Sequence, residues 1–449
     1  MGTVKIMYKI KNKYEFLINY PERILPITFF LLCLFGGILL SLPFCHKENL
    51  SIINAIFTSV SAVCVTGLSV VDIGEKLTNF GQFVLLFLIQ AGGLGIMTIS
   101  SIIFILLGKR VSLMHEKTIR NIFDAQNKEE IKTSLILIFK YTFLVELFGM
   151  LMLTIGFSMS DGFNIQSVKY AVFTSVSAFC NAGFFLRGNN LIDYYSNPVV
   201  LYSVSFLIIL GGIAPVICVS LIDLLKKRKL NPLSRIVFIT TMALIFAGTL
   251  FFFVSEYYGV LIDMNFADKF NNAWFQSVTA RTAGFNSVDM SNIYIGTYLS
   301  TIILMIIGGS PGSTAGGIKT TTFAVLILTC LNTLKRKENT VKNRKIKPDT
   351  VQKAITLTIM YLFILFLGIL MLLTTQISCP HKLIFEAVSA LGTVGLSMGS
   401  TVELDSIGKI IIIAMMFLGR VFPATLLCYL KTKDVNTKIS YPDTNIPLT

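Results

Sequence analysis

Val65-Thr66-Gly67-Leu68 is the first of four copies of a short glycine motif that decides the fold of this chain. The other copies are Asn181-Ala182-Gly183-Phe184, Thr282-Ala283-Gly284-Phe285 and Thr393-Val394-Gly395-Leu396. Each copy follows a stretch of small and hydroxyl side chains, such as Thr58-Ser59-Val60-Ser61-Ala62. The four glycines are 116, 101 and 111 residues apart (183−67, 284−183 and 395−284). This recurrence predicts one supersecondary unit used four times.

The composition predicts an all-α integral membrane protein. Hydrophobic residues make up 54% of the 449 residues and charged residues 14%, whereas soluble domains carry about 25% charged residues. Shorter apolar pieces, too short to cross a bilayer, fit re-entrant helices at 51–63, 166–179, 270–280 and 382–391. They alternate with eight apolar runs of spanning length, at 24–42, 80–107, 134–158, 199–225, 236–258, 298–334, 351–376 and 407–430. Each repeat therefore reads as a span, a short helix, a glycine loop and a second span.

The distribution of positive charge predicts the orientation in the membrane. Of 38 Lys and Arg residues, 27 lie in the termini and in three connections between repeats, so these segments are expected in the cytoplasm. The net charge of +14 then reports topology, and no nucleic-acid partner is expected. Basic residues precede the first apolar run, which favours a first span over a cleaved signal peptide. The expected segments are repeats at 24–107, 134–225, 236–334 and 351–430, and cytoplasmic parts at 1–23, 108–133, 226–235, 335–350 and 431–449.

The glycine loops predict a cation site made of backbone carbonyl groups. Glycine reaches positive φ and can aim a carbonyl where a residue with a Cβ would be strained, and a ring of carbonyls can replace the hydration shell of a cation. The loops carry no acidic residue, which argues against a Ca²⁺ site and favours K⁺. The alternative is that the glycines serve helix packing, which four matched copies make the weaker interpretation. Most Ser and Thr hydroxyls of the short helices are expected to bond back to their own helix.

A second set of positions follows each glycine by 24 to 28 residues. Three spans carry glycine pairs there, whereas the fourth has Gly419-Arg420. An arginine inside a membrane is costly and usually faces a cavity or a partner group, so Arg420 is a candidate functional charge. The alternative is a structural pair between Arg420 and backbone carbonyl groups. The third repeat breaks its span with glycine, serine and proline residues that cannot continue a helix. This candidate gating loop comprises Gly309, Ser310, Pro311, Gly312, Ser313, Thr314, Ala315, Gly316 and Gly317.

Two tempting motifs are weak, whereas Glu146 inside the third span is interpreted as part of a buried pair or as a hydrogen-bonded structural carboxylate, with a role in the ion path as the alternative. The stretch from Gly308 to Thr320 fails the phosphate-loop spacing because Ile318 separates Gly317 from Lys319. Gly395 to Gly399 matches the G-x-S-x-G elbow of hydrolases around Ser397, but it lies in a glycine loop without a placed histidine base. The eight cysteines show no C-x-x-C spacing, so neither a metal site nor a disulfide framework is favoured.

Taken together, the motifs carry a family resemblance over nearly the whole chain. The four loops, Gln90-Ala91-Gly92-Gly93-Leu94-Gly95, the Gly308 to Thr320 stretch and Gly419-Arg420 resemble the membrane subunit of bacterial Ktr potassium uptake systems, within the Trk/Ktr/HKT superfamily. The resemblance implies four M1-P-M2 repeats (membrane helix, pore helix, membrane helix) in a pseudo-fourfold arrangement around a single pore. One departure is Pro311, where the family pattern has a small polar residue.

The same resemblance implies a function and partners. It implies K⁺ uptake across a bacterial plasma membrane, often stimulated by Na⁺ as in symport, by a homodimer whose opening is controlled by a cytosolic nucleotide-binding RCK ring. No dinucleotide fingerprint occurs here, so the chain itself is expected to hold no organic cofactor, and its basic segments are expected to dock the ring or meet membrane lipid. The implied gating residues are the loop above and Arg420. The implied selectivity filter is Val65, Thr66, Gly67, Asn181, Ala182, Gly183, Thr282, Ala283, Gly284, Thr393, Val394 and Gly395.

Three rival functions remain open from the sequence. The first is a Na⁺-selective or weakly selective pore of the same superfamily. The second is a membrane enzyme that uses Ser397. The third is the channel-like subunit of an ATP-driven pump.

Overall fold

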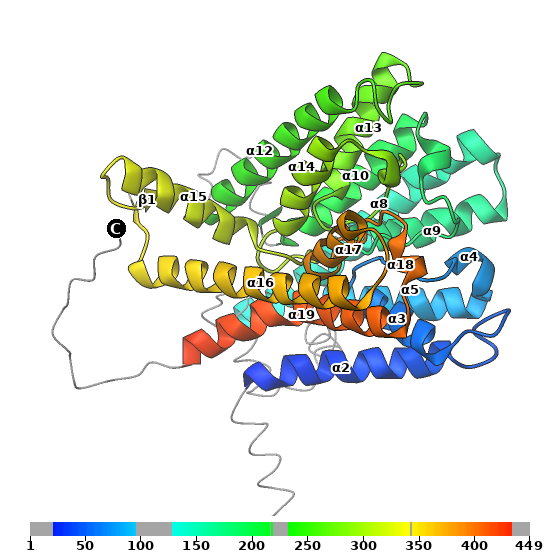
Figure 1. Cartoon of the computed structure of the whole chain (residues 1–449), viewed down its shortest axis with the longest axis horizontal. Helices are drawn as coiled ribbons and strands as arrows, with labels where there is room; N and C mark the ends of the chain where they lie inside the picture. Colours follow the sequence, from blue (N-terminus) through cyan, green and yellow to red (C-terminus); the bar gives the residue numbers. More distant parts are fainter. Residues whose placement is uncertain (1–20, 96–127, 216, 219–231, 342–343, 433–449) are drawn as a thin grey trace, which may run out of the picture.

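The computed structural model describes residues 21–95, 128–215, 217–218, 232–341 and 344–432 (Figure 1). The expected cytoplasmic segments 1–23, 108–133, 226–235 and 431–449 lie mostly outside these residues. The described part is helical apart from a small antiparallel hairpin in which β1 (Thr340–Val341) pairs with β2 (Arg344–Lys345). Figure 1 shows this hairpin projecting from the helical body between two long helices.

The helices follow the order that the apolar runs predict. In the first half of the chain they are α2 (Pro21–Leu40), α3 (Ile52–Val63), α4 (Ile73–Lys76), α5 (Asn79–Leu94), α8 (Lys128–Asp161), α9 (Ile165–Phe179), η1 (Ile192–Tyr194) and α10 (Pro198–Gly212). In the second half they are α12 (Pro232–Ser255), α13 (Phe266–Thr279), η2 (Met290–Asn292), α14 (Ile295–Ile306), α15 (Thr320–Leu334), α16 (Pro348–Thr375), α17 (Pro380–Gly392), α18 (Ser400–Glu403) and α19 (Ser406–Thr432).

Within the described residues, four helices are long and apolar enough to cross a membrane, whereas eight spans were expected. These four lie in α8, α12, α16 and α19. The other expected spans contain shorter apolar helices. The run 298–334 is divided into α14 and α15, as the glycines and proline between them predict. The run 199–225 is helical in α10 only to Gly212, a break that the sequence did not predict. The run 80–107 begins as α5 and continues outside the described residues.

The four short helices have recognisable starts. Ser51, Asn164 and Asn265 each accept a hydrogen bond at the helix N-terminus from the backbone N–H three residues on, which satisfies a donor that has no partner within the helix. The fourth, α17, starts with Pro380 at its first turn, where a missing N–H is harmless. Local capping therefore starts each short helix at a defined residue, before the chain turns into a glycine loop.

Hydroxyl groups tie three of the short helices to the preceding long helix. Ser59 Oγ donates to the Cys33 carbonyl at 2.7 Å. The equivalent bonds join Ser175 to the Glu146 carbonyl at 2.6 Å and Ser277 to the Ile245 carbonyl at 2.7 Å. The expectation that most of these hydroxyls bond back to their own helix is wrong, because long helices pass close enough to accept the proton.

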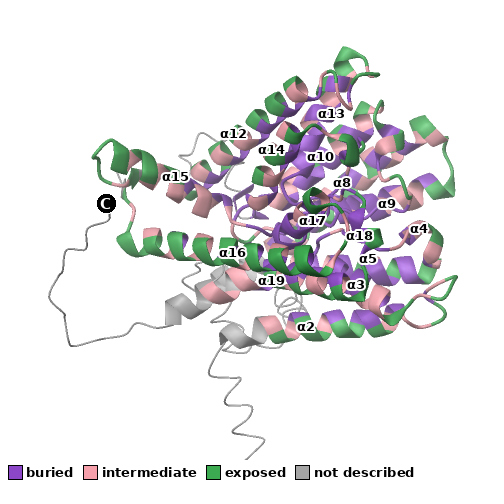
Figure 2. Ribbon diagram, in the orientation of Figure 1, coloured by how far each residue is buried: buried purple, intermediate pink, exposed green. Residues whose placement is uncertain are grey.

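The short helices also pack in a closed cycle. Each contacts the long helix before it in the chain and, in addition, the second helix of the preceding repeat. These cyclic contacts join α9 to α5, α13 to α10, α17 to α14 and, closing the circle, α3 to α19. Figure 2 shows the result, with buried residues gathered around the short helices and exposed ones along the outer faces of helices such as α16. Side chains on that outer face include Phe363 and Phe366, which suits contact with lipid.

Close backbone contact between elements gives a first prediction. A Cβ built on Gly211 in α10 would lie 1.8 Å from the Phe179 carbonyl oxygen at the end of α9, whereas one built on Gly212 would meet only the Asn181 amide, at 3.4 Å. We expect Gly211→Ala to lower the free energy of unfolding by about 1–3 kcal/mol through overpacking. Gly212→Ala is the matched control and should be near neutral. The melting temperatures of both variants are measured by thermal unfolding in detergent. Equal melting temperatures would contradict the packing argument.

Candidate functional site

The four glycine loops share one backbone conformation. The residue two positions before each glycine has a positive φ, with values of 57° at Val65, 59° at Asn181, 79° at Thr282 and 49° at Thr393. The glycines themselves have φ values of 96°, 69°, 79° and 92° at 67, 183, 284 and 395. Positive φ is uncommon for residues with a side chain. Its repetition at four matched positions therefore indicates a conformation that the surrounding structure imposes.

The loops meet one another in a closed ring. A Cβ built on Gly67 would lie 2.4 Å from the Ala182 carbonyl oxygen of the second loop. The corresponding contacts run from Gly183 to the Ala283 oxygen at 2.6 Å, from Gly284 to the Val394 oxygen at 2.4 Å and from Gly395 to the Thr66 oxygen at 2.1 Å. The last contact returns to the first loop. The structure thus brings the expected filter residues of all four repeats together.

Serine hydroxyls hold three of the loops from behind. Ser61 Oγ accepts from the Gly67 N–H at 3.1 Å, Ser177 Oγ from Phe184 N–H at 3.0 Å and Ser389 Oγ from Gly395 N–H at 3.0 Å. In the third loop the Ala283 N–H donates to the Thr279 carbonyl at 3.0 Å. Because these N–H groups are bonded to the short helices, they do not turn toward the ring.

The broken segment of the third repeat inserts beside the break in α10. The Ser310 N–H donates to the Gly212 carbonyl at 3.0 Å, and Ser310 Oγ accepts from the Ala214 N–H at 2.7 Å. Thr314 Oγ1 donates to the Gly211 carbonyl at 3.0 Å. The loop therefore supplies the hydrogen bonds that the interrupted end of α10 would lack, which explains why α10 stops at Gly212.

Arg420 joins this loop to a helix of another repeat. Its guanidinium donates to the Thr314 carbonyl and, at 2.9 Å, to the Gly92 carbonyl in α5. Lys319, at the other end of the loop, donates to the Ala315 carbonyl at 2.6 Å. The segment between residues 309 and 317 is buried except near its tip, where Gly312 is exposed. Arg420 thus contacts the loop that the sequence marked as the gating candidate.

Two charged residues near the ring were missed from the sequence. Arg281 follows α13 and is 8% exposed, and its guanidinium donates to the Gly308 carbonyl at 3.0 Å, at the start of the broken segment. Glu386 lies in α17 and is fully buried. The available signal was asymmetry, because the other three loops carry no charge between helix end and glycine where Arg281 stands.

Ser397 does not have the surroundings of a hydrolytic nucleophile. Its hydroxyl donates to Glu386 Oε1 at 2.6 Å and accepts from the Gly399 N–H at 2.9 Å. The described histidines, His46 and His381, form no hydrogen bond with it. Among the described residues there is also no group of three His, Cys, Asp or Glu side chains that could hold a metal ion.

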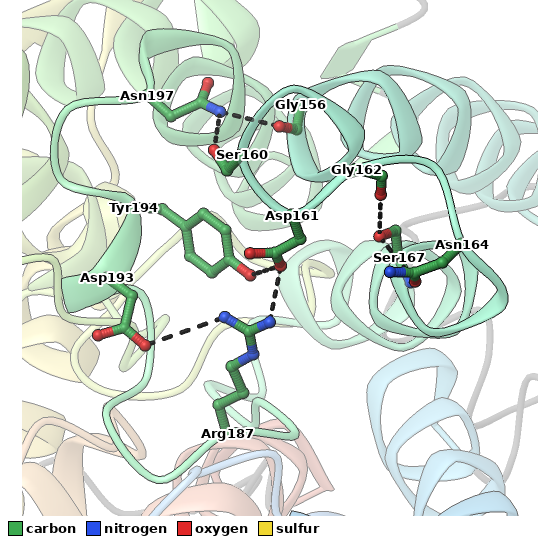
Figure 3. Close-up of polar contacts among 10 residues, drawn as sticks. All are labelled: Gly156, Ser160, Asp161, Gly162, Asn164, Ser167, Arg187, Asp193, Tyr194 and Asn197. Carbon is green, nitrogen blue, oxygen red and sulfur yellow. Dashed lines mark hydrogen bonds and ion pairs between the residues drawn. The ribbon is translucent and has the colours of Figure 1, made fainter.

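A cluster of polar and aromatic side chains braces the connection after the second loop (Figure 3). Arg187 bonds Asp161 at 2.7 Å, approaches Asp193 at 4.0 Å and lies over the rings of Tyr170 and Tyr194. The Tyr194 hydroxyl donates to the same Asp161 carboxylate at 2.5 Å. Burial, and then this hydrogen bond, raise the pKa of Tyr194, so its hydroxyl stays protonated as a donor.

The cluster gives a second prediction. Asp161→Asn should weaken two charge-assisted hydrogen bonds and lower the free energy of unfolding by about 1–2 kcal/mol. Asp193→Asn is the matched control, because Asp193 is more exposed and its contact with Arg187 is 4.0 Å long. Thermal unfolding of the two variants measures the difference. Equal melting temperatures would show that Asp161 does not brace this connection.

Comparisons with known proteins agree with this architecture. The TrkH family model of cation transport proteins matches residues 9–435. The Ktr system potassium uptake protein B of Bacillus subtilis (strain 168) is 39% identical over 430 residues, covering 94% of this chain and 95% of that protein. The potassium/sodium uptake protein NtpJ of Enterococcus hirae is 34% identical, covering 95% of this chain and 97% of that protein. The crystal structure of the potassium transporter TrkH from Vibrio parahaemolyticus has a similar fold, with a TM-score of 0.68 and 19% identity over 90% of this chain and 83% of that one.

The apolar helices and these relatives define the class as a membrane transport protein. The chain belongs to the TrkH family of cation transport proteins, and Ktr potassium uptake proteins are among its relatives. The resemblance drawn from the sequence is confirmed. The prediction that the chain is not an enzyme is confirmed as well, because the relatives are named as transporters.

Proposed function

We propose that this protein mediates K⁺ uptake through the ring formed by the four glycine loops. Carbonyl groups of residues 65–67, 181–183, 282–284 and 393–395 would bind the dehydrated ion. One observation carries the proposal, namely the closed sequence of contacts from Gly67 through Gly183 and Gly284 to Gly395 and back. Four equivalent glycine loops around one axis suit a single small cation, because each loop can offer backbone carbonyl oxygens without a carboxylate. The names of the relatives support K⁺ as the cargo.

The proposal includes the M1-P-M2 arrangement of four repeats around one pore. The short helices would be pore helices that enter from outside, with both termini in the cytoplasm. Support comes from the cyclic packing of α3, α9, α13 and α17 against second helices of neighbouring repeats. The partly negative C-terminal ends of these helices lead into the loops and favour a cation there.

The loop from Gly309 to Gly317 would act as the gate, with Arg420 holding it closed. Support comes from the bonds that Arg420 makes to Thr314 and Gly92, since they tie the loop across the bundle. We further propose a homodimer, stimulation by Na⁺, and control by a cytosolic nucleotide-binding RCK ring. The short basic loops and the C-terminal tail are the expected docking surface, with contact to anionic membrane lipid as the alternative.

The test is growth rescue. A bacterium that lacks K⁺ uptake systems, expressing this chain with an RCK partner, should grow at micromolar to millimolar K⁺. Without the partner, uptake should be weaker. Absence of rescue from membranes that contain the folded protein would contradict the proposal. Uptake that requires a P-type ATPase partner would favour the pump-subunit alternative.

A Na⁺-preferring or weakly selective pore is the second candidate, which the name of NtpJ as a potassium/sodium uptake protein favours. Competition between ⁸⁶Rb⁺ and Na⁺ separates the two candidates. K⁺ selectivity predicts that excess Na⁺ leaves ⁸⁶Rb⁺ uptake undiminished, whereas a weakly selective pore predicts strong inhibition.

A further inference from the structure

Glu386 is a buried carboxylate behind the fourth glycine loop. It lies in α17, and its side chain is fully buried. Oε1 accepts from Ser397 Oγ at 2.6 Å and from the Met398 N–H at 3.1 Å, and Oε2 accepts from Thr401 Oγ1 at 2.5 Å. One turn further along α17, Ser389 accepts from the Gly395 N–H. Glu386 and Ser389 together fasten the loop at its glycine and just beyond it.

All three partners can donate to an ionised carboxylate. The Met398 N–H can only donate. Ser397 Oγ already accepts from the Gly399 N–H, so its own proton points to Glu386. Thr401 has a hydroxyl proton to give as well. These three donors favour the charged form of the side chain, whereas its burial opposes that form.

The charge belongs to one repeat only. The matching residue of the third repeat is Gln276, whose amide donates to Ser287 Oγ, just after Gly284, at 3.4 Å. Gln276 is thus a neutral counterpart of the Glu386 contact with Ser397. The first and second repeats have Thr58 and Thr174 at this position. At this position of the four short helices, a carboxylate therefore occurs only in the fourth repeat.

No lysine or arginine side chain within the described ranges forms an ion pair with Glu386. A buried charge without a counter-ion is costly, and hydrogen bonds from neutral donors offset only part of this cost. A cation in the ring would supply the opposite charge, because only the loop segment that Glu386 fastens lies between the carboxylate and the ring. Attraction across one segment of backbone remains substantial where water is excluded.

From this geometry we infer that Glu386 is a positioning residue, which fixes the loop beside the ion path and raises the affinity of that path for monovalent cations. It holds the strand after Gly395 and adds one negative charge beside the ring. This inference rests on the proposed K⁺ transport and extends it to an asymmetric filter. The first, second and third repeats would contribute carbonyls alone, whereas the fourth contributes carbonyls and charge.

The experiment compares charge with hydrogen bonding in the full-length protein. Glu386→Gln keeps groups that can bond Ser397, Met398 and Thr401 but removes the charge, as in the third repeat. We expect the KM for ⁸⁶Rb⁺ uptake to rise ~10-fold with little change in Vmax. Ser397→Ala removes one hydrogen bond and keeps the charge, so its KM should stay within about twofold of wild type.

Membrane abundance is measured for every variant, so that poor folding is separated from altered transport. An unchanged KM in a well-expressed Glu386→Gln protein would overturn the inference. Equal increases in KM for Glu386→Gln and Ser397→Ala would overturn it too, because hydrogen bonding alone would then explain both. If Glu386→Gln does not reach the membrane, Glu386→Asp decides: a retained KM supports a role for the charge, and a raised KM contradicts it. Failure of the wild-type chain to take up ⁸⁶Rb⁺ would instead refute the proposed function.

Discussion

Gly67→Ser should abolish most of the preference for K⁺ over Na⁺. A serine Cβ at this position would lie 2.4 Å from the Ala182 carbonyl oxygen and 3.1 Å from Gly183 Cα, so the backbone on one side of the contact must move. The backbone φ of 96° adds strain for any residue with a side chain. The second loop must then shift, and a displaced carbonyl no longer replaces the hydration shell of K⁺ equally well. We expect the K⁺/Na⁺ ratio to fall by at least ~10-fold, equivalent to about 1.4 kcal/mol.

Competition between ⁸⁶Rb⁺ and Na⁺ in cells that express the variant measures this ratio. Gly162→Ser is a matched control, since Gly162 has a φ of 80° but a Cβ at this position would meet nothing within 4 Å. It reproduces the backbone strain without touching the ring, and its ion preference should equal that of the wild type. An unchanged ratio in Gly67→Ser would mean that the ring does not select the ion.

Arg420→Ala should raise K⁺ flux in the absence of a cytosolic partner. The substitution removes the bonds from the guanidinium to Thr314 and Gly92, which hold the broken segment of the third repeat against α5. Hydrogen bonds from charged donors contribute about 1.5–3 kcal/mol each. Loss of even part of that stabilisation would increase the open population by roughly tenfold. Flux of ⁸⁶Rb⁺ into proteoliposomes made with the purified variant measures the effect.

Lys409→Ala provides the comparison on the same helix. Lys409 lies near the start of α19 and bonds Asn54 at 3.0 Å, without contact to the broken segment. Its removal should leave flux unchanged. Shortening the segment between Gly312 and Gly316 should act in the same direction as Arg420→Ala. Unchanged flux in both the Arg420 and the shortened variants would show that this segment is no gate.

Much of the helical architecture could be predicted because bilayers and backbone chemistry constrain it. The starts and ends of α3, α9, α13 and α17 follow from apolar length, capping residues and the glycines that succeed them. The division between α14 and α15 follows from residues that cannot remain helical. These features depend on neighbours in the chain, which a sequence displays directly.

What escaped prediction depends on contacts between distant segments. The end of α10 at Gly212 lies inside a run that the sequence predicts as one span, and it is stabilised by Ser310, about a hundred residues away. Arg281 was not singled out from the sequence, yet its side chain donates to the Gly308 carbonyl. Periodicity carries no information about either partner. Comparison among the four repeats does single out Arg281, since only the third copy carries a charge at that position.

The contacts in the ring of glycines run in one direction, which predicts where second-site suppressor mutations should arise. Each glycine faces the carbonyl of the next loop in the chain, and the fourth faces the first. A larger residue at Gly183 therefore displaces the third loop and leaves the first largely undisturbed. Second-site suppressors of such a change are expected in the succeeding copy, at or beside Ala283. A change at one glycine is therefore expected to call for compensation in the succeeding copy and not in the preceding one.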